Sequence, residues 1–228
     1  MLQREAQKWQ DFNENKVQSN YPQWPNEVMV KLVFGDYLKT KIQVNNTSKV
    51  LDIGCGFGNN LLPFLSMGCQ CFGIEVTQEM ASQTQRILEE RGYVVDIKCG
   101  KNTSIPFGDH HFDLILSINV IHYESTYEDI KAALQEYSRI LKKGGRILIM
   151  TVGPEHSIIK RAKVVGPNNY EIQNYDFRDG SLFFCFNSLE YLDYCMSHFF
   201  SNVEVGRVTE NLMTTNLDFF IAICGSKK

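Results

Sequence analysis

The chain has 228 residues, 43% hydrophobic and 21% charged, so it is long enough for one packed α/β domain and its composition excludes global disorder. Its 23 basic and 26 acidic side chains give a net charge of −3, which argues against a general attraction to nucleic acid. No apolar run approaches the roughly 18 residues that a membrane-spanning helix needs. The polar N-terminus has no signal-peptide pattern. We therefore expect a cytoplasmic protein without a membrane partner.

The cysteines stand singly, mostly within apolar segments, and they form neither a Cys-x-x-Cys pair nor a Cys/His cluster with zinc spacing. We expect reduced thiols that act as small buried hydrophobes. No metal site is predicted. The cysteines are at positions 55, 69, 71, 99, 185, 195 and 224.

The first 25 residues are polar with interspersed aromatic side chains, and we interpret them as an N-terminal cap segment. A helix is expected from Pro25, because proline suits a first helical position. Its apolar face would comprise Met29, Leu32, Val33 and Tyr37.

Apolar strands and amphipathic helices then alternate, which implies a parallel sheet covered by helices on both faces. The predicted strands are residues 49–53, 70–74, 94–98, 112–117 and 146–151. The helices predicted between the first of them are residues 59–67 and 78–91. A further helix is predicted to begin at the capping-box pattern 125–128, to carry Lys142 and Lys143 in its last turn, and to end at Gly144.

The last third of the chain has a different pattern. Residues 153–187 show no clear period, and a connection of this length is typical of a lid or a binding element, so we expect an insertion that covers a substrate. A helix over 188–200 and two strands near 202–208 and 217–224 follow, close enough to pair antiparallel.

The most informative local pattern is Asp-x-Gly-x-Gly-x-Gly over residues 52–58, which joins a buried strand to the start of a helix. Glycines there permit positive φ angles and let a ligand lie against bare backbone, beside the free N–H groups of the helix N-terminus. Glu75 ends the second strand, 21 positions after Gly54, where an acidic side chain can accept both hydroxyl protons of a ribose.

The spacing of the glycines distinguishes two cofactors. A dinucleotide fingerprint needs Gly-x-Gly-x-x-Gly. Here the third glycine, Gly58, comes one position early, and Asn59 stands where that glycine would be. The pattern therefore disfavours a dinucleotide.

At this point the chain resembles the class I S-adenosylmethionine-dependent methyltransferases of the small-molecule type (methyltransferase domain 11/25-like). Residues 100–113, 114–123 and 141–149 resemble, in the right order, the family's third-strand loop, its fourth-strand motif and its turn into the fifth strand. The resemblance covers about residues 45–152 and extends in layout to the C-terminus. It implies one domain over 1–228 with a three-layer, doubly wound, Rossmann-like α/β fold. The mostly parallel seven-stranded sheet would have the order 3-2-1-4-5-7-6, with the last strand antiparallel.

The resemblance also implies roles for residues of the glycine turn and the strand ends. Asp52 would hold the turn and orient the amino group of the methionine part, Glu75 would bind the ribose, and Val76 would pack on the adenine. Asn119 would lie near the methionine carboxylate. The full predicted cofactor set is Asp52, Gly54, Cys55, Gly56, Gly58, Glu75, Val76, Lys101, Asn102, Thr103, Ser117 and Asn119.

One position departs from the family pattern. The family usually has an acid after the third-strand glycine to receive the adenine amino group, whereas this chain has Lys101. Lysine is a donor only and cannot accept from that amine. We expect Asn102 or a backbone carbonyl to bind the adenine instead.

The cofactor determines the chemistry that the protein must supply. Because the sulfonium methyl group is already activated, the protein mainly aligns an acceptor with the methyl–sulfur bond. His122 and Tyr123, just past the fourth strand, are the candidate catalytic residues if a base is needed. Tyr21 and Tyr170 are the candidate substrate contacts.

Three functions stay open at this stage. The first is transfer of a methyl group to oxygen or nitrogen of a small-molecule acceptor, and the second is a non-catalytic module that binds S-adenosylmethionine. The third is a nicotinamide-dependent oxidoreductase, which the glycine spacing disfavours. The acceptor and the oligomeric state are not predicted.

Overall fold

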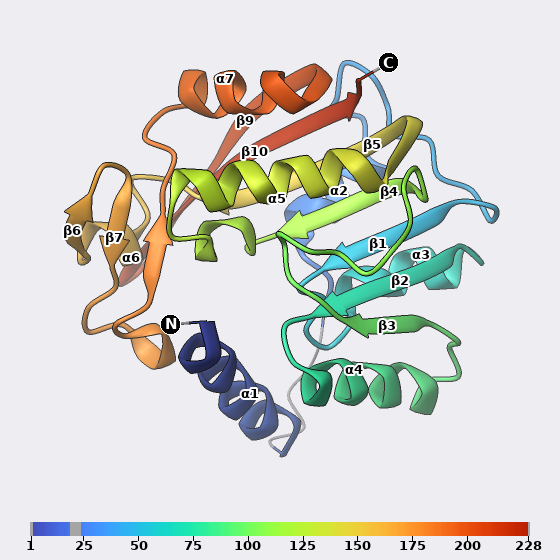
Figure 1. Ribbon diagram of the computed structural model, residues 1–228, viewed down its shortest axis with the longest axis horizontal. Helices are drawn as coiled ribbons and strands as arrows, with labels where there is room; N and C mark the ends of the chain where they lie inside the picture. Colours follow the sequence, from blue (N-terminus) through green and yellow to red (C-terminus); the bar gives the residue numbers. More distant parts are fainter. Residues whose placement is uncertain (1, 19–23, 228) are drawn as a thin grey trace.

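The computed structural model describes residues 2–18 and 24–227. Its centre is a seven-stranded sheet with the order β3-β2-β1-β4-β5-β10-β9 (Figure 1). Because β9 and β10 are the sixth and seventh strands of this sheet along the chain, the predicted order 3-2-1-4-5-7-6 is confirmed. The strands are β1 (Lys49–Ile53), β2 (Gln70–Glu75), β3 (Asp96–Cys99), β4 (Phe112–Ile118), β5 (Leu141–Val152), β9 (Phe200–Leu212) and β10 (Thr215–Ser226).

The pairing of the strands explains where a ligand can bind. β1 pairs in parallel with β2 on one side and with β4 on the other, so the chain winds outward in both directions from this pair. β10 runs in the direction opposite to the other strands and pairs antiparallel with both β5 and β9, as predicted for the last strand. Ligands of such sheets bind beside the carboxyl ends of the strands at the point where the order reverses. Here that point lies between β1 and β4.

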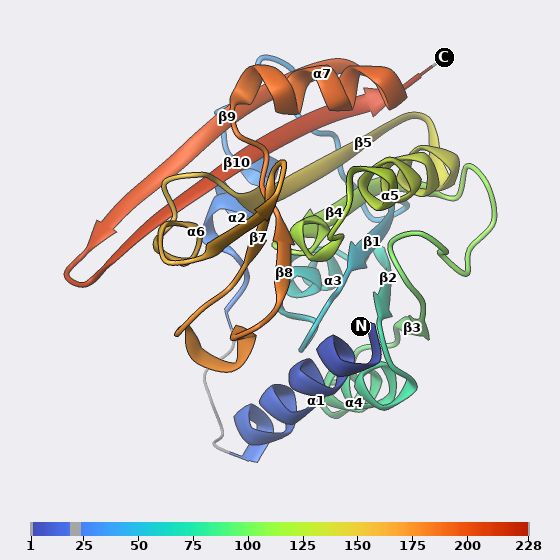
Figure 2. The same ribbon diagram turned by 60° about the vertical axis from the view of Figure 1, so that its left-hand side comes forward.

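Helices cover both faces of the sheet (Figures 1 and 2). On one face α5 (Tyr127–Ile140) and α7 (Leu189–Phe199) pack their buried side chains on alternate residues of the central strands. On the other face lie α2 (Glu27–Phe34), α3 (Leu62–Ser66) and α4 (Gln78–Glu90). β4 is buried on both faces, which agrees with its almost continuous apolar sequence. The three-layer architecture is therefore confirmed.

Several predicted boundaries were wrong. The helix predicted from Pro25 begins after Asn26, whose side chain accepts a hydrogen bond from the Met29 N–H, and it ends at Phe34. Tyr37 consequently lies beyond the helix and is exposed. Val94, placed in the third strand, precedes β3 and is also exposed.

The helix after the fourth strand is also displaced from its prediction. Its N-cap is Thr126, which accepts a hydrogen bond from the Asp129 N–H, one residue later than the capping-box pattern indicated. The helix ends at Ile140, and Lys142 already belongs to β5. The Lys142 Nζ lies 2.9 Å from both carboxylate oxygens of Asp113, so this lysine pairs with a strand residue instead of capping the helix.

The segment 153–187, predicted to be irregular, folds into regular structure. It contains α6 (Ser157–Lys160), η3 (Asp176–Arg178) and a three-stranded antiparallel sheet of order β6-β7-β8. The strands are β6 (Lys163–Gly166), β7 (Asn169–Glu171) and β8 (Leu182–Phe184). Strands of three or four residues are too short for an alternating pattern to be seen in the sequence. The segment has its own apolar cluster, which includes Ile158, Ile172 and Phe183.

The N-terminal segment, predicted as a cap, contains α1 (Leu2–Gln18). The dark-blue helix in Figure 1 lies beside the carboxyl edge of the parallel strands. Its aromatic residues contact the insertion: the ring centroids of Phe12 and Phe177 are 4.2 Å apart, and those of Trp9 and Phe177 are 4.7 Å apart. The two segments that flank the recognisable motifs in the sequence therefore meet in space.

Two predicted absences can be compared with the described part of the chain. None of its helices has the length and apolar character needed to cross a membrane. Residues 2–18 and 24–227 contain no group of three or more metal-ligating side chains. The cysteines are free, and all but Cys99 are buried, as expected.

Candidate functional site

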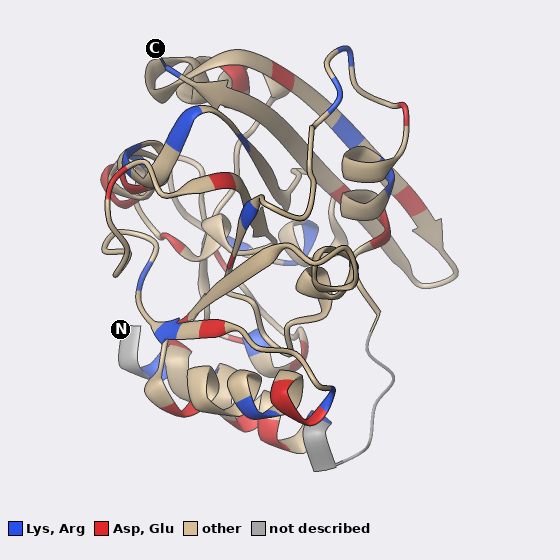
Figure 3. Cartoon of the chain, turned by 90° about the vertical axis from the view of Figure 1, so that its right-hand side faces the viewer, with Lys and Arg blue, Asp and Glu red and all other residues tan. Residues whose placement is uncertain are grey.

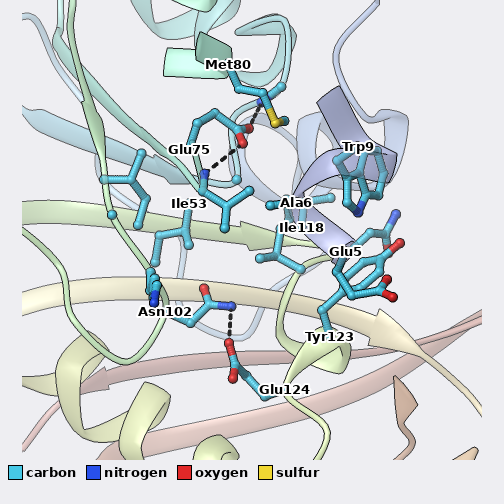
Figure 4. A pocket seen from close by; sticks show the side chains of 18 of the residues that line it. Glu5, Ala6, Trp9, Ile53, Glu75, Met80, Asn102, Ile118, Tyr123 and Glu124 are labelled. Carbon is cyan, nitrogen blue, oxygen red and sulfur yellow. Dashed lines mark hydrogen bonds between the residues drawn. The ribbon is translucent and has the colours of Figure 1, made fainter. Parts of the chain in front are cut away.

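A cavity of about 240 Å³ lies at the carboxyl ends of β1, β2, β3 and β4, with α1 as its opposite wall (Figure 4). The strand ends and the turns that follow them supply one side. α1 supplies residues spaced along one helix face. The lining residues are Glu5, Ala6, Trp9, Asn13, Ile53, Gly54, Gly56, Ile74, Glu75, Val76, Met80, Gly100, Lys101, Asn102, Ile118, Asn119, Val120, Tyr123 and Glu124.

The glycines of the turn after β1, Gly54, Gly56 and Gly58, have different surroundings. All three have positive φ angles, from 55° to 75°. A Cβ atom on Gly54 would lie 2.7 Å from a Val120 methyl group, and one on Gly58 would lie 2.6 Å from a Leu88 methyl group, so these two permit close packing. A Cβ atom on Gly56 would meet no atom within 4 Å. Gly56 is thus the glycine that leaves the turn open toward the cavity.

Glu75, at the end of β2, lies across this turn. Its Oε1 accepts a hydrogen bond of 2.6 Å from the Gly56 N–H, and its Oε2 accepts one of 3.2 Å from the Val76 N–H. The side chain is only 5% exposed. Burial raises the pKa of Glu75 to about 7, although the two backbone donors favour its charged form. The carboxylate is therefore fixed on the cavity wall with acceptor capacity left over.

Asp52 and Asn119 leave acceptor oxygens without donors. Asp52, which is 1% exposed, has no well-formed hydrogen bond to either carboxylate oxygen, although the Asn60 side chain lies close enough to lower its pKa. Oδ1 of Asn119 has no hydrogen-bond partner among the described residues. Burial, and then the nearby charge of Glu75, raise the pKa of Asp52 to about 8. Asn119 also has a left-handed backbone, with φ of 59°. Buried acceptors without donors are costly, and such strained residues cluster at functional sites.

A chain of hydrogen bonds runs along another wall of the cavity. The Ser117 and Tyr137 hydroxyl oxygens are 3.3 Å apart, and the Tyr137 hydroxyl donates to Oδ1 of Asn102 at 2.7 Å. Nδ2 of Asn102 in turn donates to Oε1 of Glu124 at 2.9 Å. This chain fixes the Asn102 amide and the Glu124 carboxylate relative to β4 and α5.

α1 is attached to the insertion by polar contacts as well as by its aromatic rings. The Ser181 hydroxyl donates to Oε2 of Glu5 at 2.6 Å, and the Lys8 Nζ donates to the Asp179 carbonyl oxygen at 2.6 Å. Trp9 also contacts Tyr123, with ring centroids 5.7 Å apart. Figure 4 shows Glu5, Trp9 and Tyr123 on the same side of the cavity, away from Glu75.

The structure brings together part of the predicted site. The predicted residues that line the cavity are Gly54, Gly56, Glu75, Val76, Lys101, Asn102, Asn119 and Tyr123. Those that do not line it are Asp52, Cys55, Gly58, Thr103, Ser117, His122 and Tyr170. Tyr21 lies outside the described residues.

His122, predicted as a candidate base, is turned away from the cavity. It is 2% exposed, and its ring packs on Phe183 with centroids 4.5 Å apart. Its Nδ1 is 3.4 Å from the Thr151 hydroxyl. Burial lowers the pKa of His122 to about 3, so the imidazole is neutral. Tyr170 packs instead with the apolar cluster of the insertion.

The sequence did not indicate the α1 wall or several further lining residues, among them Met80 and Glu124. Ala6, Trp9 and Asn13 follow a helical i, i+3, i+7 spacing, which is the signal that could have identified this face. Met80 and Glu124 follow β2 and β4 by several residues and carry no motif of their own. Their place in the site depends on the turns between.

Comparison with known proteins gives a family for the central segment. Residues 51–149 match the family described as a methyltransferase domain. The uncharacterized methyltransferase YcgJ of Bacillus subtilis is 33% identical over 113 residues, which make up 49% of this chain and 44% of that protein. The chain spans about half the length of the curated relatives it matches.

Solved structures share the fold. A SAM-dependent methyltransferase of Methanosarcina mazei superimposes with a TM-score of 0.68 at 16% identity, over 80% of this chain and 94% of that one. The 1,6-didemethyltoxoflavin-N1-methyltransferase of Burkholderia thailandensis, solved with bound 1,6-didemethyltoxoflavin and S-adenosylhomocysteine, gives a TM-score of 0.60 at 17% identity, over 80% of this chain and 72% of that one. The match over residues 51–149 agrees with the resemblance to methyltransferases in that segment, and the solved structures share its fold.

Proposed function

We propose that this chain, whose residues 51–149 match a methyltransferase domain, binds S-adenosylmethionine and transfers its methyl group to oxygen or nitrogen of a small-molecule acceptor. The observation that supports it most is the set of buried oxygens without donors beside the open Gly56 turn. An ammonium group satisfies such acceptors, and the methionine part of the cofactor carries one. We further propose that residues 1–228 work as one domain.

The residues present suit the cofactor. In this proposal Asn119, which lines the cavity, accepts from the ammonium group, and Asp52 holds the glycine turn from behind it. Gly56 lets the methionine part pass, and Glu75 accepts from the ribose hydroxyls. Val76 packs on the adenine. When bound, S-adenosylmethionine supplies a methyl group on a cationic sulfur, which a lone pair of oxygen or nitrogen can take.

We assign the binding site of the methyl acceptor to the side of the cavity where α1 and Tyr123 face each other. Trp9 and Tyr123 provide aromatic surface, which suits a flat or apolar acceptor. Burial raises the pKa of the Tyr123 hydroxyl, so it stays protonated and orients the acceptor as a hydrogen-bond donor. We do not assign the base to His122, because it does not line the cavity.

Two observations favour a small acceptor over nucleic acid. α1 and the insertion are joined beside the cavity by Trp9, Glu5 and their partners, which limits the size of a molecule that can enter there. Basic and acidic residues are interspersed along the chain, without a face of one sign in the view of Figure 3.

A methyl-transfer assay tests the proposal. The full chain is incubated with S-adenosylmethionine labelled in its methyl group and with pools of small hydroxyl and amine compounds, a transfer RNA pool in a separate arm. We expect label in a small molecule. Label in RNA would overturn the acceptor class, and binding of S-adenosylhomocysteine without transfer to any pool would favour a non-catalytic module. Gly56→Val is the matched inactive control.

A further inference from the structure

At the adenine end of the cavity, the side chain at position 101 is no acceptor for a 6-amino group. Gly100, Lys101 and Asn102, which follow β3, form the wall there together with Val76. An amino group is a donor, and lysine offers donors only, so Lys101 cannot receive it. The Oδ1 of Asn102 already accepts from Tyr137, and its Nδ2 already donates to Glu124. A carboxylate on this wall would be a stronger acceptor for the amino group than an amide oxygen that is already engaged.

Glu124 is the carboxylate on this wall. It lines the cavity, and only its Oε1 makes a hydrogen bond with a described residue. Ser117, Tyr137 and Asn102 fix it through successive hydrogen bonds, so its position is set by β4 and α5 and not by a free side chain. Figure 4 shows Asn102 and Glu124 paired at the end of the cavity opposite Glu75 and Met80.

The groups around Glu124 allow it to act as a hydrogen-bond acceptor. Burial raises the pKa of Glu124, whereas the Asn102 hydrogen bond and the charge of Lys101 favour its ionised form. Asp129, from the first turn of α5, acts in the opposite direction. Position 101 therefore does not supply the carboxylate itself, but its lysine stabilises the charged form of the nearby Glu124.

We propose that Glu124 receives the 6-amino group of the cofactor's adenine and determines the preference for adenine at this end of the cavity. The inference rests on the cofactor binding proposed above. Asn102 is then a positioning residue that holds the carboxylate.

The test compares S-adenosylhomocysteine with its 6-deamino analogue, which has hydrogen in place of the amino group, by calorimetric titration of the full chain. The wild type should bind S-adenosylhomocysteine about tenfold tighter or more, because a hydrogen bond to a charged acceptor is lost in the analogue. Glu124→Ala should bring the ratio of the two dissociation constants close to one, with the affinity for the analogue little changed.

Controls keep the outcome specific. Glu128→Gln removes an exposed carboxylate from the same segment and should leave the ratio as in the wild type. If Glu124→Ala does not fold, Glu124→Gln, which keeps the shape and removes the charge, should still lower the ratio several-fold. An unchanged ratio in a folded Glu124 variant overturns the inference. Failure of the wild type to bind S-adenosylhomocysteine overturns the proposed function instead.

Discussion

At the turn after β1, acceptor oxygens are gathered without donors to match them. Oδ1 of Asn119 is buried and unpaired among the described residues, the buried Asp52 has only the nearby Asn60 side chain, and Glu75 lies across the same turn. Leaving such groups buried costs free energy of unfolding, on the order of 1–3 kcal/mol each. A bound ligand that supplies the missing donors would remove this cost. We therefore place the ammonium end of the cofactor here.

The glycine turn gives a prediction with a matched control. Gly56→Val should abolish binding of S-adenosylhomocysteine, because its side chain would enter the open space that a Cβ atom at 56 faces. Gly92→Val is the control, since Gly92 also has a positive φ and an equally open Cβ direction, but it lies outside the cavity lining. Both variants should lose about 1–2 kcal/mol of stability from left-handed strain. Calorimetric titration should show lost binding in Gly56→Val alone. Equal binding by both would place the cofactor elsewhere.

The buried carboxylates predict a pH dependence of stability. The pKa values of Asp52 and Glu75 are raised to about 8 and about 7, so between pH 7 and 8 the folded chain holds protons that the unfolded chain has lost. The free energy of unfolding should therefore fall by about 1 kcal/mol over this interval. The buried His122 and His156 act in the opposite direction, but mainly below their unfolded pKa of about 6.5.

Urea titrations at pH 7 and 8 measure this slope. Asp52→Asn should remove most of it, and Asp36→Asn, at an exposed position, should leave it unchanged. A slope that survives Asp52→Asn would mean that another group titrates.

At the scale of elements, the central strands and helices could be predicted because their patterns are long. Buried β4 and the amphipathic α4 and α5 repeat their periods over enough residues to be recognised. Element boundaries were mispredicted where a tertiary contact is made. Lys142 was expected in the last turn of a helix, but it pairs with Asp113 and belongs to β5. β6, β7 and β8 are too short to show a period.

α1 and the insertion should respond to ligand together. Trp9 packs on Phe177, and Glu5 accepts from Ser181, so ordering of α1 over a bound ligand should also protect residues 176–181. Hydrogen exchange with and without S-adenosylhomocysteine measures this. The tip of the β9–β10 hairpin, which extends from the body of the molecule in Figure 2, should not change. Trp9→Ala should uncouple the two segments, and protection of α1 alone in the wild type would contradict the coupling.

At the scale of the whole molecule, the sheet order was predictable and the complete cavity was not. The glycine turn, Glu75 and the later motifs are local patterns, and they predict which strand ends lie beside a ligand. The cavity also needs Glu5, Trp9 and Glu124, which come from segments far apart in the sequence. Only the folded chain brings them together, so the adenine-binding and acceptor ends could not be assigned from spacing.

The central claim, that the cavity binds the cofactor of methyl transfer, is tested most directly by the thermal unfolding of the full chain with S-adenosylhomocysteine and, separately, with NAD. At about one hundred times its dissociation constant, S-adenosylhomocysteine should add about 2.7 kcal/mol to the free energy of unfolding. For a chain of this size that should raise the melting temperature by roughly 5–10 °C, with no shift from NAD. No shift at millimolar S-adenosylhomocysteine, or an equal shift with NAD, would contradict the account.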